Sequence, residues 1–460
     1  MEIAEIESLS TDYEKLRTKV LNEKTNGQAV KDYLKQYEPE NHDVIKDTTN
    51  RPDKLISTDQ KTYTAKVARL AIPVQKKIVA LAAAFLCGNP IKLTAAPAND
   101  LEKDLLAVVM KTWANNKLDY ESKHIAKLMM SQTEAAEIWY RVDADDLYWI
   151  GTANATRPHR LRVKIIAPSL GDTLYPVFNN AGDMIAFGRE YTVKLEGKDE
   201  QHFDLYTDKT NYLGTKTSTG WDMKPEGNPF GKIPVIYYSQ PKPEWADVQT
   251  LIDRWEKTIS NHSDTNDYFA SPMVKVTGTI KGFAEKGESG KVIELENGAD
   301  AEYMSWDQSP KSMELEFKNL RSLIFDMTDT PDISIEQMQS LGTYSGIALK
   351  MLFLSAHLKA ADKEENFGKS IQRRINLIKA AMAVINVNLA KATALDITPK
   401  FEYYLPKDEA GIIDMLVSAT GSKPVMTIDT AVRNNPLVID AEKEIIALKE
   451  ETKVEDITPV

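Results

Sequence analysis

Apolar residues recur at three- and four-residue steps in four long stretches of the chain, which predicts amphipathic helices. The first stretch runs from about Thr64 to Leu86, and Pro73 inside it implies a kink or a restart of the helix. The first sixty residues are polar and also favour helices, apart from a loop predicted at 41–54. The remaining helices are predicted at 100–113, 119–131, 244–270, 310–328 and 346–391.

Between about Ala136 and Tyr238 the pattern changes to short runs rich in β-branched and aromatic residues, which are typical of strands. The turn residues 179–182 separate two of these runs and predict a hairpin. Because no helical pattern separates the runs, we expect the strands to be antiparallel. A further strand is predicted at 400–405, followed by a helical C-terminal segment. The predicted fold class is therefore α+β.

The helices at 244–270 and 310–328 bracket a compact glycine-rich insertion, 272–307, that contains strand-like runs. The apolar residues of the second helix alternate between steps of four and three, which makes a narrow seam suited to packing beside another helix. Such a seam is too narrow to bury the core of a monomer, so neighbours in a ring are natural partners. An ordinary helical hairpin within one monomer is the alternative. The predicted interface residues are Trp245, Trp255, Met313, Phe317, Leu320 and Ile324. The two tryptophans could equally be buried within one chain.

Composition narrows the possible functions. Of the 460 residues, 42% are hydrophobic and 27% are charged, as in a chain that folds around a core. The net charge of −11 argues against a free-standing basic DNA-binding protein, which needs many Lys and Arg on one surface. Cys87 is the only cysteine, so no intrachain disulfide can form and a reducing compartment fits. The acidic start predicts no signal peptide, and the longest apolar run is too short to span a membrane. We therefore expect no membrane partner.

Signals for catalysis are weak throughout the chain. The six histidines are scattered, and none has the spacing of a zinc-protease motif. Gly368-Lys369-Ser370 resembles the end of a phosphate-binding loop, but Lys363 stands where the first glycine belongs and the segment lies inside a predicted helix. We expect no catalytic residues, no metal site and no cofactor, so the chain is not expected to be an enzyme.

Four segments carry a family resemblance through their order along the chain. They are 82–93 (AAAFLCGNPIKL), 228–240 (NPFGKIPVIYYSQ), 243–278 (from PEWADVQ to the first glycine of the insertion) and 328–351 (TDTPDISIEQMQSLGTYSGIALKM). Each is a loose pattern of glycine, proline and apolar residues. Together, with a helix, an insertion and a helix in the expected places, they resemble the portal proteins of tailed double-stranded DNA bacteriophages. The likeness extends from about Tyr63 to Glu450.

The resemblance implies a portal fold in a ring of identical subunits, usually twelve, around a DNA channel. It divides the chain into a wing (1–243), a first stem helix (244–271), a clip (272–308), a second stem helix (309–328), a tunnel loop (329–345), a long helix and strand of the wing (346–406) and a crown (407–460). The implied partners are double-stranded DNA, the terminase motor, capsid and scaffold proteins and the head–tail adaptor. The implied place is the portal vertex of the virion, after assembly in the bacterial host cytoplasm. Two alternatives are another ring-forming head–tail adaptor and a nucleotide-dependent packaging enzyme.

The charge of two segments suggests how strongly such a channel would bind DNA. Residues 243–271 contain six acidic and two basic side chains, a sum of −4, and residues 329–345 contain three acids and no Lys or Arg. A conduit needs weak contacts, since each neutralised phosphate adds affinity and hinders sliding. The predicted DNA-facing residues are Asp329, Asp332, Glu336, Gln337, Thr343 and Tyr344. Ordinary solvated acids on helix faces are the alternative explanation.

Gly342 and Gly346 flank the end of the predicted tunnel loop and are its expected hinges, because glycine adopts many backbone conformations. They also suit a plain helix boundary with Ser345 as the N-terminal cap.

Overall fold

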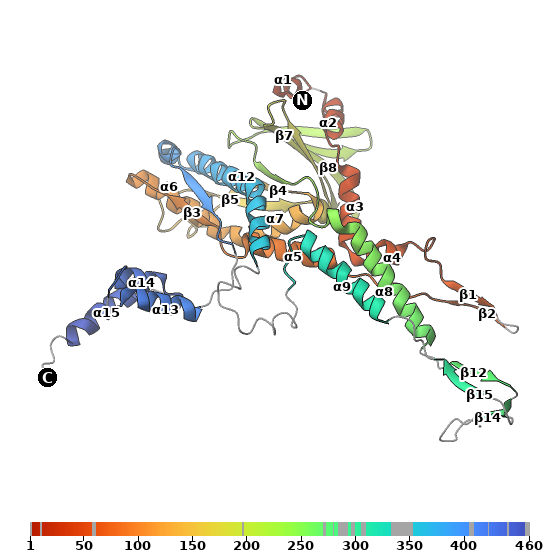
Figure 1. Ribbon diagram of the computed structural model, residues 1–460. Helices are drawn as coiled ribbons and strands as arrows, with labels where there is room; N and C mark the ends of the chain where they lie inside the picture. Colours follow the sequence, from red (N-terminus) through yellow and green to blue (C-terminus); the bar gives the residue numbers. More distant parts are fainter. Residues whose placement is uncertain are drawn as a thin grey trace.

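The computed structural model describes most of the chain (Figure 1). The described residues are 2–9, 12–57, 61–195, 197–269, 273–278, 280–283, 293–295, 300–304, 310–332, 353–403, 409–421, 423–438 and 441–455. They form a mixture of helices and antiparallel strands, in agreement with the predicted class. Within these ranges no helix combines the length and the apolar character needed to cross a membrane.

The N-terminal part begins with short helices and a small hairpin. Its elements are α1 (Ile3–Ser8), α2 (Tyr13–Asn22), α3 (Gly27–Tyr37), α4 (Asp43–Lys46), β1 (Lys54–Ser57) and β2 (Thr62–Ala65). The helical prediction for this region is confirmed in outline. The predicted loop at 41–54 is only partly correct, because α4 lies within it and β1 begins at its end.

The helix predicted from Thr64 to Leu86 is much shorter in the structure. Helix α5 spans Val74–Cys87, and Pro73 is the residue that precedes it. Proline has no N–H to donate and its ring clashes with a preceding helical turn, so Pro73 starts the helix instead of kinking it. The residues before it form β2 and then an extended segment.

The central region contains two antiparallel sheets. The region begins with β3 (Lys92–Ala95), α6 (Asp100–Asn115) and α7 (Leu118–Gln132). The strands that follow are β4 (Glu134–Asp143), β5 (His159–Ile166), β6 (Asp172–Phe178), β7 (Met184–Leu195), β8 (Lys198–Tyr206), β9 (Thr210–Thr217), β10 (Gly220–Gly227) and β11 (Val235–Ser239). One sheet has the order β11-β4-β5 and the other has the order β10-β9-β8-β7-β6. The predicted hairpin joins β6 to β7. Gly182 takes the positive φ of 85° there, and the Asn179 side chain accepts hydrogen bonds from two backbone N–H groups of the turn.

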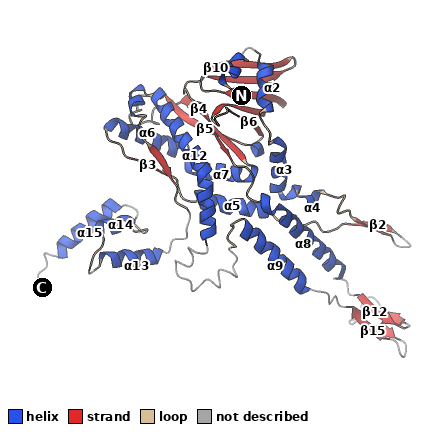
Figure 2. Ribbon diagram, turned by 45° about the horizontal axis from the view of Figure 1, so that its top comes forward, coloured by secondary structure: helices blue, strands red, loops and turns tan. Residues whose placement is uncertain are grey.

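The second half of the chain is mainly helical. Helix α8 (Gln249–Phe269) and helix α9 (Pro310–Met327) lie side by side and extend away from the sheets (Figures 1 and 2). Between them β12 (Met273–Thr277) pairs with β15 (Asp300–Met304), and β13 (Ile280–Phe283) pairs with β14 (Ile293–Leu295). The remaining elements are α12 (Leu354–Ile385), β16 (Ile397–Lys400), α13 (Glu409–Thr420), α14 (Ile428–Asn434) and α15 (Ala441–Glu455).

Two predicted boundaries near the end of the chain are wrong. The long helix was expected to reach Lys391, but α12 ends at Ile385, where Asn386 caps a short 3₁₀ helix and donates to the carbonyl of Ala153. The strand expected at 400–405 is displaced toward the N-terminus, because β16 pairs with β3 and ends at Lys400. Phe401 instead packs against Phe367 of α12, with ring centroids 6.2 Å apart.

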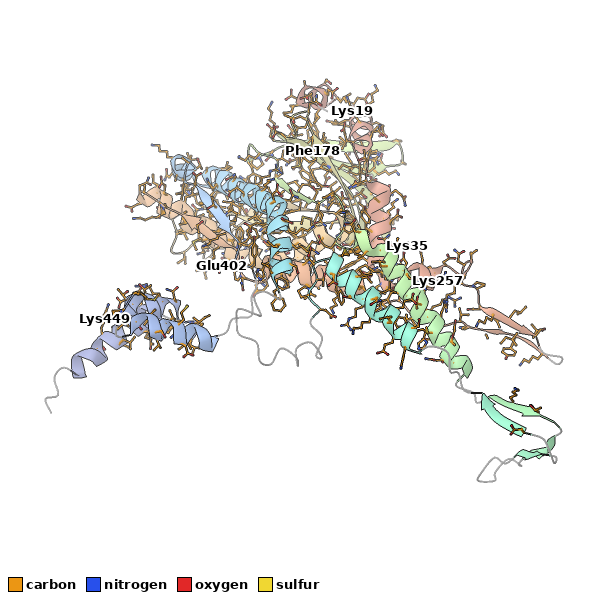
Figure 3. All side chains as sticks on the ribbon, in the orientation of Figure 1. Lys19, Lys35, Phe178, Lys257, Glu402 and Lys449 are labelled. Atoms are coloured by element: carbon orange, nitrogen blue, oxygen red, sulfur yellow. The ribbon has the colours of Figure 1, made fainter. Side chains whose placement is uncertain are left out.

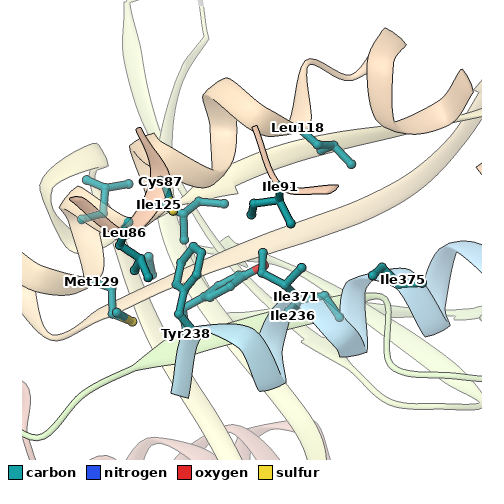
Figure 4. Packing of buried hydrophobic residues seen from close by; sticks show 14 of the residues in the cluster. Leu86, Cys87, Ile91, Leu118, Ile125, Met129, Ile236, Tyr238, Ile371 and Ile375 are labelled. Carbon is teal, nitrogen blue, oxygen red and sulfur yellow. The ribbon is translucent and has the colours of Figure 1, made fainter. Parts of the chain in front are cut away.

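The main hydrophobic core lies between helices α5, α6, α7 and α12 and the sheet formed by β11, β4 and β5. Figure 4 shows its centre, where Ile371 of α12 lies near Tyr238 of β11 and Ile125 of α7. A second cluster joins α1 and α2 to the five-stranded sheet, and a third lies between the two sheets.

One buried ion pair crosses the main core. The side chains of Arg374 on α12 and Glu137 on β4 are both 0% exposed, and Arg374 Nε donates to the two carboxylate oxygens at 2.9 and 3.1 Å. Arg374 Nη1 also donates to Ser122 of α7 at 2.7 Å. Glu137 accepts further hydrogen bonds from Trp139 and Tyr238. Burial alone would lower the pKa of Arg374, but the Glu137 carboxylate raises it, so the arginine stays charged.

We predict that Arg374→Met destabilises the protein by about 3–5 kcal/mol, because it leaves the Glu137 charge buried without a partner. The neighbouring exposed residue supplies the control, and Arg373→Met should change stability by about 0.5 kcal/mol or less. The double variant Glu137→Leu/Arg374→Met should recover part of the loss. Urea unfolding followed by circular dichroism measures all three, and equal costs at the two arginines would contradict this account.

Candidate subunit and DNA-facing surfaces

The base of the α8–α9 pair is tied to α12 by a buried charge cluster. Glu244, just before α8, is 2.9 Å from Lys359 Nζ and 2.6 Å from Lys363 Nζ. Burial alone would raise the pKa of Glu244, but the two lysines outweigh burial and lower it. Lys359 Nζ also donates to the carbonyl of Thr328 at 2.7 Å, just after α9. One cluster therefore holds the roots of both helices.

The extended segment before α5 runs along α8 and is held by polar side chains. Glu256, Ser260 and Asp264 lie about one helical turn apart along α8. Each accepts one hydrogen bond from a backbone N–H of the segment, and the three donors are alternate residues. The three bonds run from Ile72 to Glu256 (2.8 Å), from Leu70 to Ser260 (3.0 Å) and from Ala68 to Asp264 (2.6 Å). Four helical residues rise about 6 Å and two extended residues span about 6.6 Å, so the two backbones stay in step.

This polar ladder explains why the segment before Pro73 is not helical. Its N–H groups have acceptors on α8, which replace those that a helix would supply. The ladder also positions the β1–β2 hairpin, because Arg51 donates to Asp264 at 2.6 Å and to the carbonyl of Ala68 at 3.0 Å.

The β1–β2 hairpin extends away from the two sheets, beside α8 (Figures 1 and 3). Leu55 is 72% exposed, and Ile56 and Tyr63 are also exposed. An isolated two-stranded hairpin is marginally stable in water. Ile56 and Tyr63 pair across the strands and share one face of the hairpin, whereas Leu55 lies on the other face, so both faces carry candidate contact residues.

The structure places the predicted interface residues mostly inside one chain. Trp245 is 0% exposed, stacks on Tyr37 with ring centroids 5.5 Å apart and donates to Gln36 at 3.0 Å. The prediction that Trp245 contacts another subunit is therefore wrong, because it has no surface left to offer. Trp255 is partly buried against the same core.

The seam of α9 also packs within the chain. Leu320 and Ile324 are buried, and Ile324 belongs to the main core, so these two are not free for a neighbour either. Met313 and Phe317 are half-buried, and the Phe317 ring lies 6.0 Å from the His262 ring of α8. The cause is that α9 packs against α8 and the short 3₁₀ helix Ala246–Val248 of the same chain.

Two exposed residues on α9 were missed by the pattern. Leu315 and Leu323 are exposed, as is Met327 at the end of the helix. The sequence did contain a signal for them, because Leu315 and Leu323 are large apolar residues that lie outside the seam of alternating four- and three-residue steps. Both are exposed on the projecting helix α9, which makes them candidate subunit contacts.

Only two of the predicted DNA-facing residues belong to the described part of the chain. Asp329 is exposed and adopts a left-handed backbone conformation, φ 48°, where α9 ends. Asp332 is half-buried and lies 2.7 Å from Arg321 and 4.0 Å from Lys77. Cations from outside the predicted loop therefore offset the charge of Asp332 within the same chain. The other predicted positions lie outside the described residues: Glu336, Gln337, Gly342, Thr343, Tyr344 and Gly346.

The described ranges contain no group of three or more His, Cys, Asp or Glu side chains that could hold a metal ion. Cys87 is buried in the main core, and burial raises the pKa of its thiol to about 12.

A comparison with protein families identifies the class to which this architecture belongs. The sequence matches the model of the phage portal protein family described as SPP1 Gp6-like over residues 13–457. The chain belongs to this family of portal proteins.

Comparisons with individual proteins add two remote likenesses. No curated protein matches the chain. One similar solved structure is the neck of an empty GTA particle computed with C6 symmetry, which is 13% identical, with 78% of this chain and 88% of that chain covered and a TM-score of 0.41. Another is the virion of a native gene transfer agent (GTA) particle, which is 12% identical, with 77% and 86% covered and a TM-score of 0.36.

A buried histidine marks the contact between α8 and the N-terminal helices. His42 Nδ1 lies 2.7 Å from Glu256 Oε1, and its Nε2 lies 2.7 Å from the carbonyl oxygen of Gln36. Burial alone would lower the pKa of His42, but the hydrogen bond and charge of Glu256 outweigh burial and raise it. Protonated His42 can donate to both acceptors at once.

We predict that His42→Asn destabilises the protein more at acidic than at alkaline pH. A raised pKa in the folded state gives stability that is present below the unfolded pKa of about 6.5 and is lost as pH rises through the folded pKa. The cost should be about 1.5–3 kcal/mol near pH 5.5, as for a hydrogen bond to a charged group, and smaller near pH 8.5. Unfolding free energies at the two pH values, with the exposed His124→Asn as control, measure the difference. A cost that is the same at both would rule out the protonated pair.

Proposed function

We propose that this chain forms a closed ring of identical copies, twelve by likeness to the family, around a channel for double-stranded DNA. The observation that carries the proposal is the family match over residues 13–457, which includes the sheets, the α8–α9 pair and the long helix α12. The ring occupies the portal vertex of a virion assembled in the cytoplasm of a bacterial host. There it nucleates head assembly with capsid and scaffold proteins, docks the terminase motor and later holds the head–tail adaptor. The motor hydrolyses ATP, and this chain does not.

The proposed division of labour follows the order of elements. Residues 1–243 and 346–406 form the wing, α8 and α9 form the stem, 272–308 form the clip, 329–345 line the channel and 407–460 form the crown. In the clip, β12–β15 and β13–β14 are each two-stranded and therefore leave edges that can pair with a neighbouring copy.

A ring interface joins two different surfaces of the same chain, because rotation brings one side of each copy against the opposite side of the next. The β1–β2 hairpin and the exposed leucines of α9 supply two such surfaces. Helix α9 and the hairpin lie on different sides of α8 in both ribbon views (Figures 1 and 2). We assign them to the contact between neighbouring stems.

We predict that Leu55→Ser/Tyr63→Ser weakens ring assembly without unfolding the chain. Burying one such side chain contributes about 1.5–3 kcal/mol, so each subunit contact should weaken by more than about tenfold. The control is Leu147→Ser/Tyr120→Ser, at two positions that are at least as accessible: Leu147 is 72% exposed, as is Leu55, and Tyr120 is 79% exposed against 47% for Tyr63. Light scattering across a dilution series, with and without reductant, gives the assembled fraction. Reductant should have no effect, since Cys87 is buried. Equal assembly by both double variants would exclude the hairpin as a contact.

We also predict that Glu336→Lys in every subunit slows DNA packaging. The ring would gain a collar of positive charge, and each added phosphate contact raises DNA affinity and its salt dependence. Glu336 is chosen over Asp332 because Arg321 already neutralises Asp332. The measurement is packaged DNA length against time at two salt concentrations, with the exposed Glu40→Lys as control. Normal packaging and normal DNA affinity would place Glu336 away from the channel.

A further inference from the structure

Strand β5 carries a row of positive charges on one face. Arg160, Arg162 and Lys164 alternate along it, so their side chains point to the same side of the sheet. Tyr140 of β4 stands opposite Arg162 in the antiparallel register and is exposed. Arg162 and Lys164 are exposed, and the Arg160 guanidinium lies 4.9 Å from the centroid of the Tyr148 ring.

These three cations have no carboxylate partner. Across the described ranges none of them makes an ion pair, although most charged clusters elsewhere in the chain are paired. Asp143, the nearest acid along β4, pairs with His159 instead. Three adjacent unpaired cations make a local positive potential on a protein of net charge −11, and this potential attracts an external anion.

The cationic face continues into a cleft of about 690 Å³ between the two sheets. Lys164 and Arg141 line the cleft from one sheet, and Arg189, Tyr191 and His202 line it from the other. The Tyr191 and His202 rings stack at 5.0 Å. Two carboxylates also line it, Asp204 and Glu226, and Asp204 accepts a hydrogen bond from Tyr206. The cleft is therefore lined by both donors and acids, and Arg189 is already paired with Asp172, so the exposed cations of β5 are the groups free to meet an anion.

We propose that the cationic face of β5 binds the phosphate backbone of double-stranded DNA at a site separate from the channel. Arg, Lys and Tyr side chains are common donors to phosphate oxygens. Alternate residues of a strand lie about 6.6 Å apart, so the three long side chains can each reach a different phosphate of the same DNA strand. The inference rests on the proposed function in one respect, that DNA is the anion presented to this chain.

The test uses the assembled full-length protein and relaxed, covalently closed circular DNA, which cannot thread a closed ring. The β5 variant is Arg160→Ser/Arg162→Ser/Lys164→Ser. The control is Lys194→Ser/Lys198→Ser/Lys224→Ser, which removes the same charge from exposed positions on the other sheet. Binding constants are measured over a series of salt concentrations by filter binding, and light scattering on the same samples records the ring.

The wild type should bind the circles with affinity that falls as salt rises. The β5 variant should reduce the slope of log K against log salt by about 2 to 3, since each lost phosphate contact removes about 0.9. The control should leave the slope within about 0.5 of wild type.

Two results would overturn the inference: no binding of circles by wild type, or equal slope changes in variant and control. Failure of the proposed function is distinguishable, because it appears in the light scattering as a wild type that does not assemble.

Discussion

The buried ion pair between Glu137 and Arg374 is the interaction on which the rest of the fold depends. Moving two charges out of water costs several kcal/mol for each ion, and only close pairing with full hydrogen bonding offsets that cost. Here the hydrogen-bond partners come from β4, β11, α7 and α12, so the pair links these four elements at one point of the core. Buried ion pairs also link other parts of the fold: Glu134 pairs with Lys24, and Asp172 pairs with Arg189.

Fixing α12 in this way also fixes the root of the projecting helix pair. Lys359 and Lys363 lie on the same helix as Arg374, and both pair with Glu244. Lys359 also donates to the carbonyl of Thr328, just after α9. Farther out, the polar ladder on α8 holds the segment that carries the β1–β2 hairpin. A projecting pair with a rigid root can present defined surfaces to neighbours, which a portal ring requires of every copy.

The spacing of apolar residues was enough to locate a helix or strand whose packing partners lie nearby in the sequence. It located α6, α7, α9 and the antiparallel β region, and the order of four segments indicated the family later matched. It failed where the deciding partner is distant in sequence. The segment before Pro73 has a helical pattern, yet its acceptors are on α8, almost two hundred residues away. The charge of Asp332 is offset from outside the predicted loop, by Arg321 on α9 and by Lys77 on α5. An apolar stripe also cannot reveal whether it is covered by its own chain, as Ile324 is, or by another copy.

The central claim is that copies of this chain close into a ring with the α8–α9 pairs around a central opening. Electron microscopy of the purified full-length protein tests it most directly, because end-on views show rotational symmetry without any assumption about function. The account predicts a ring with a central channel and, at higher resolution, paired helices around it whose neighbours are bridged by the β1–β2 hairpin. Monomers, or a solid particle without an axial opening, would contradict it.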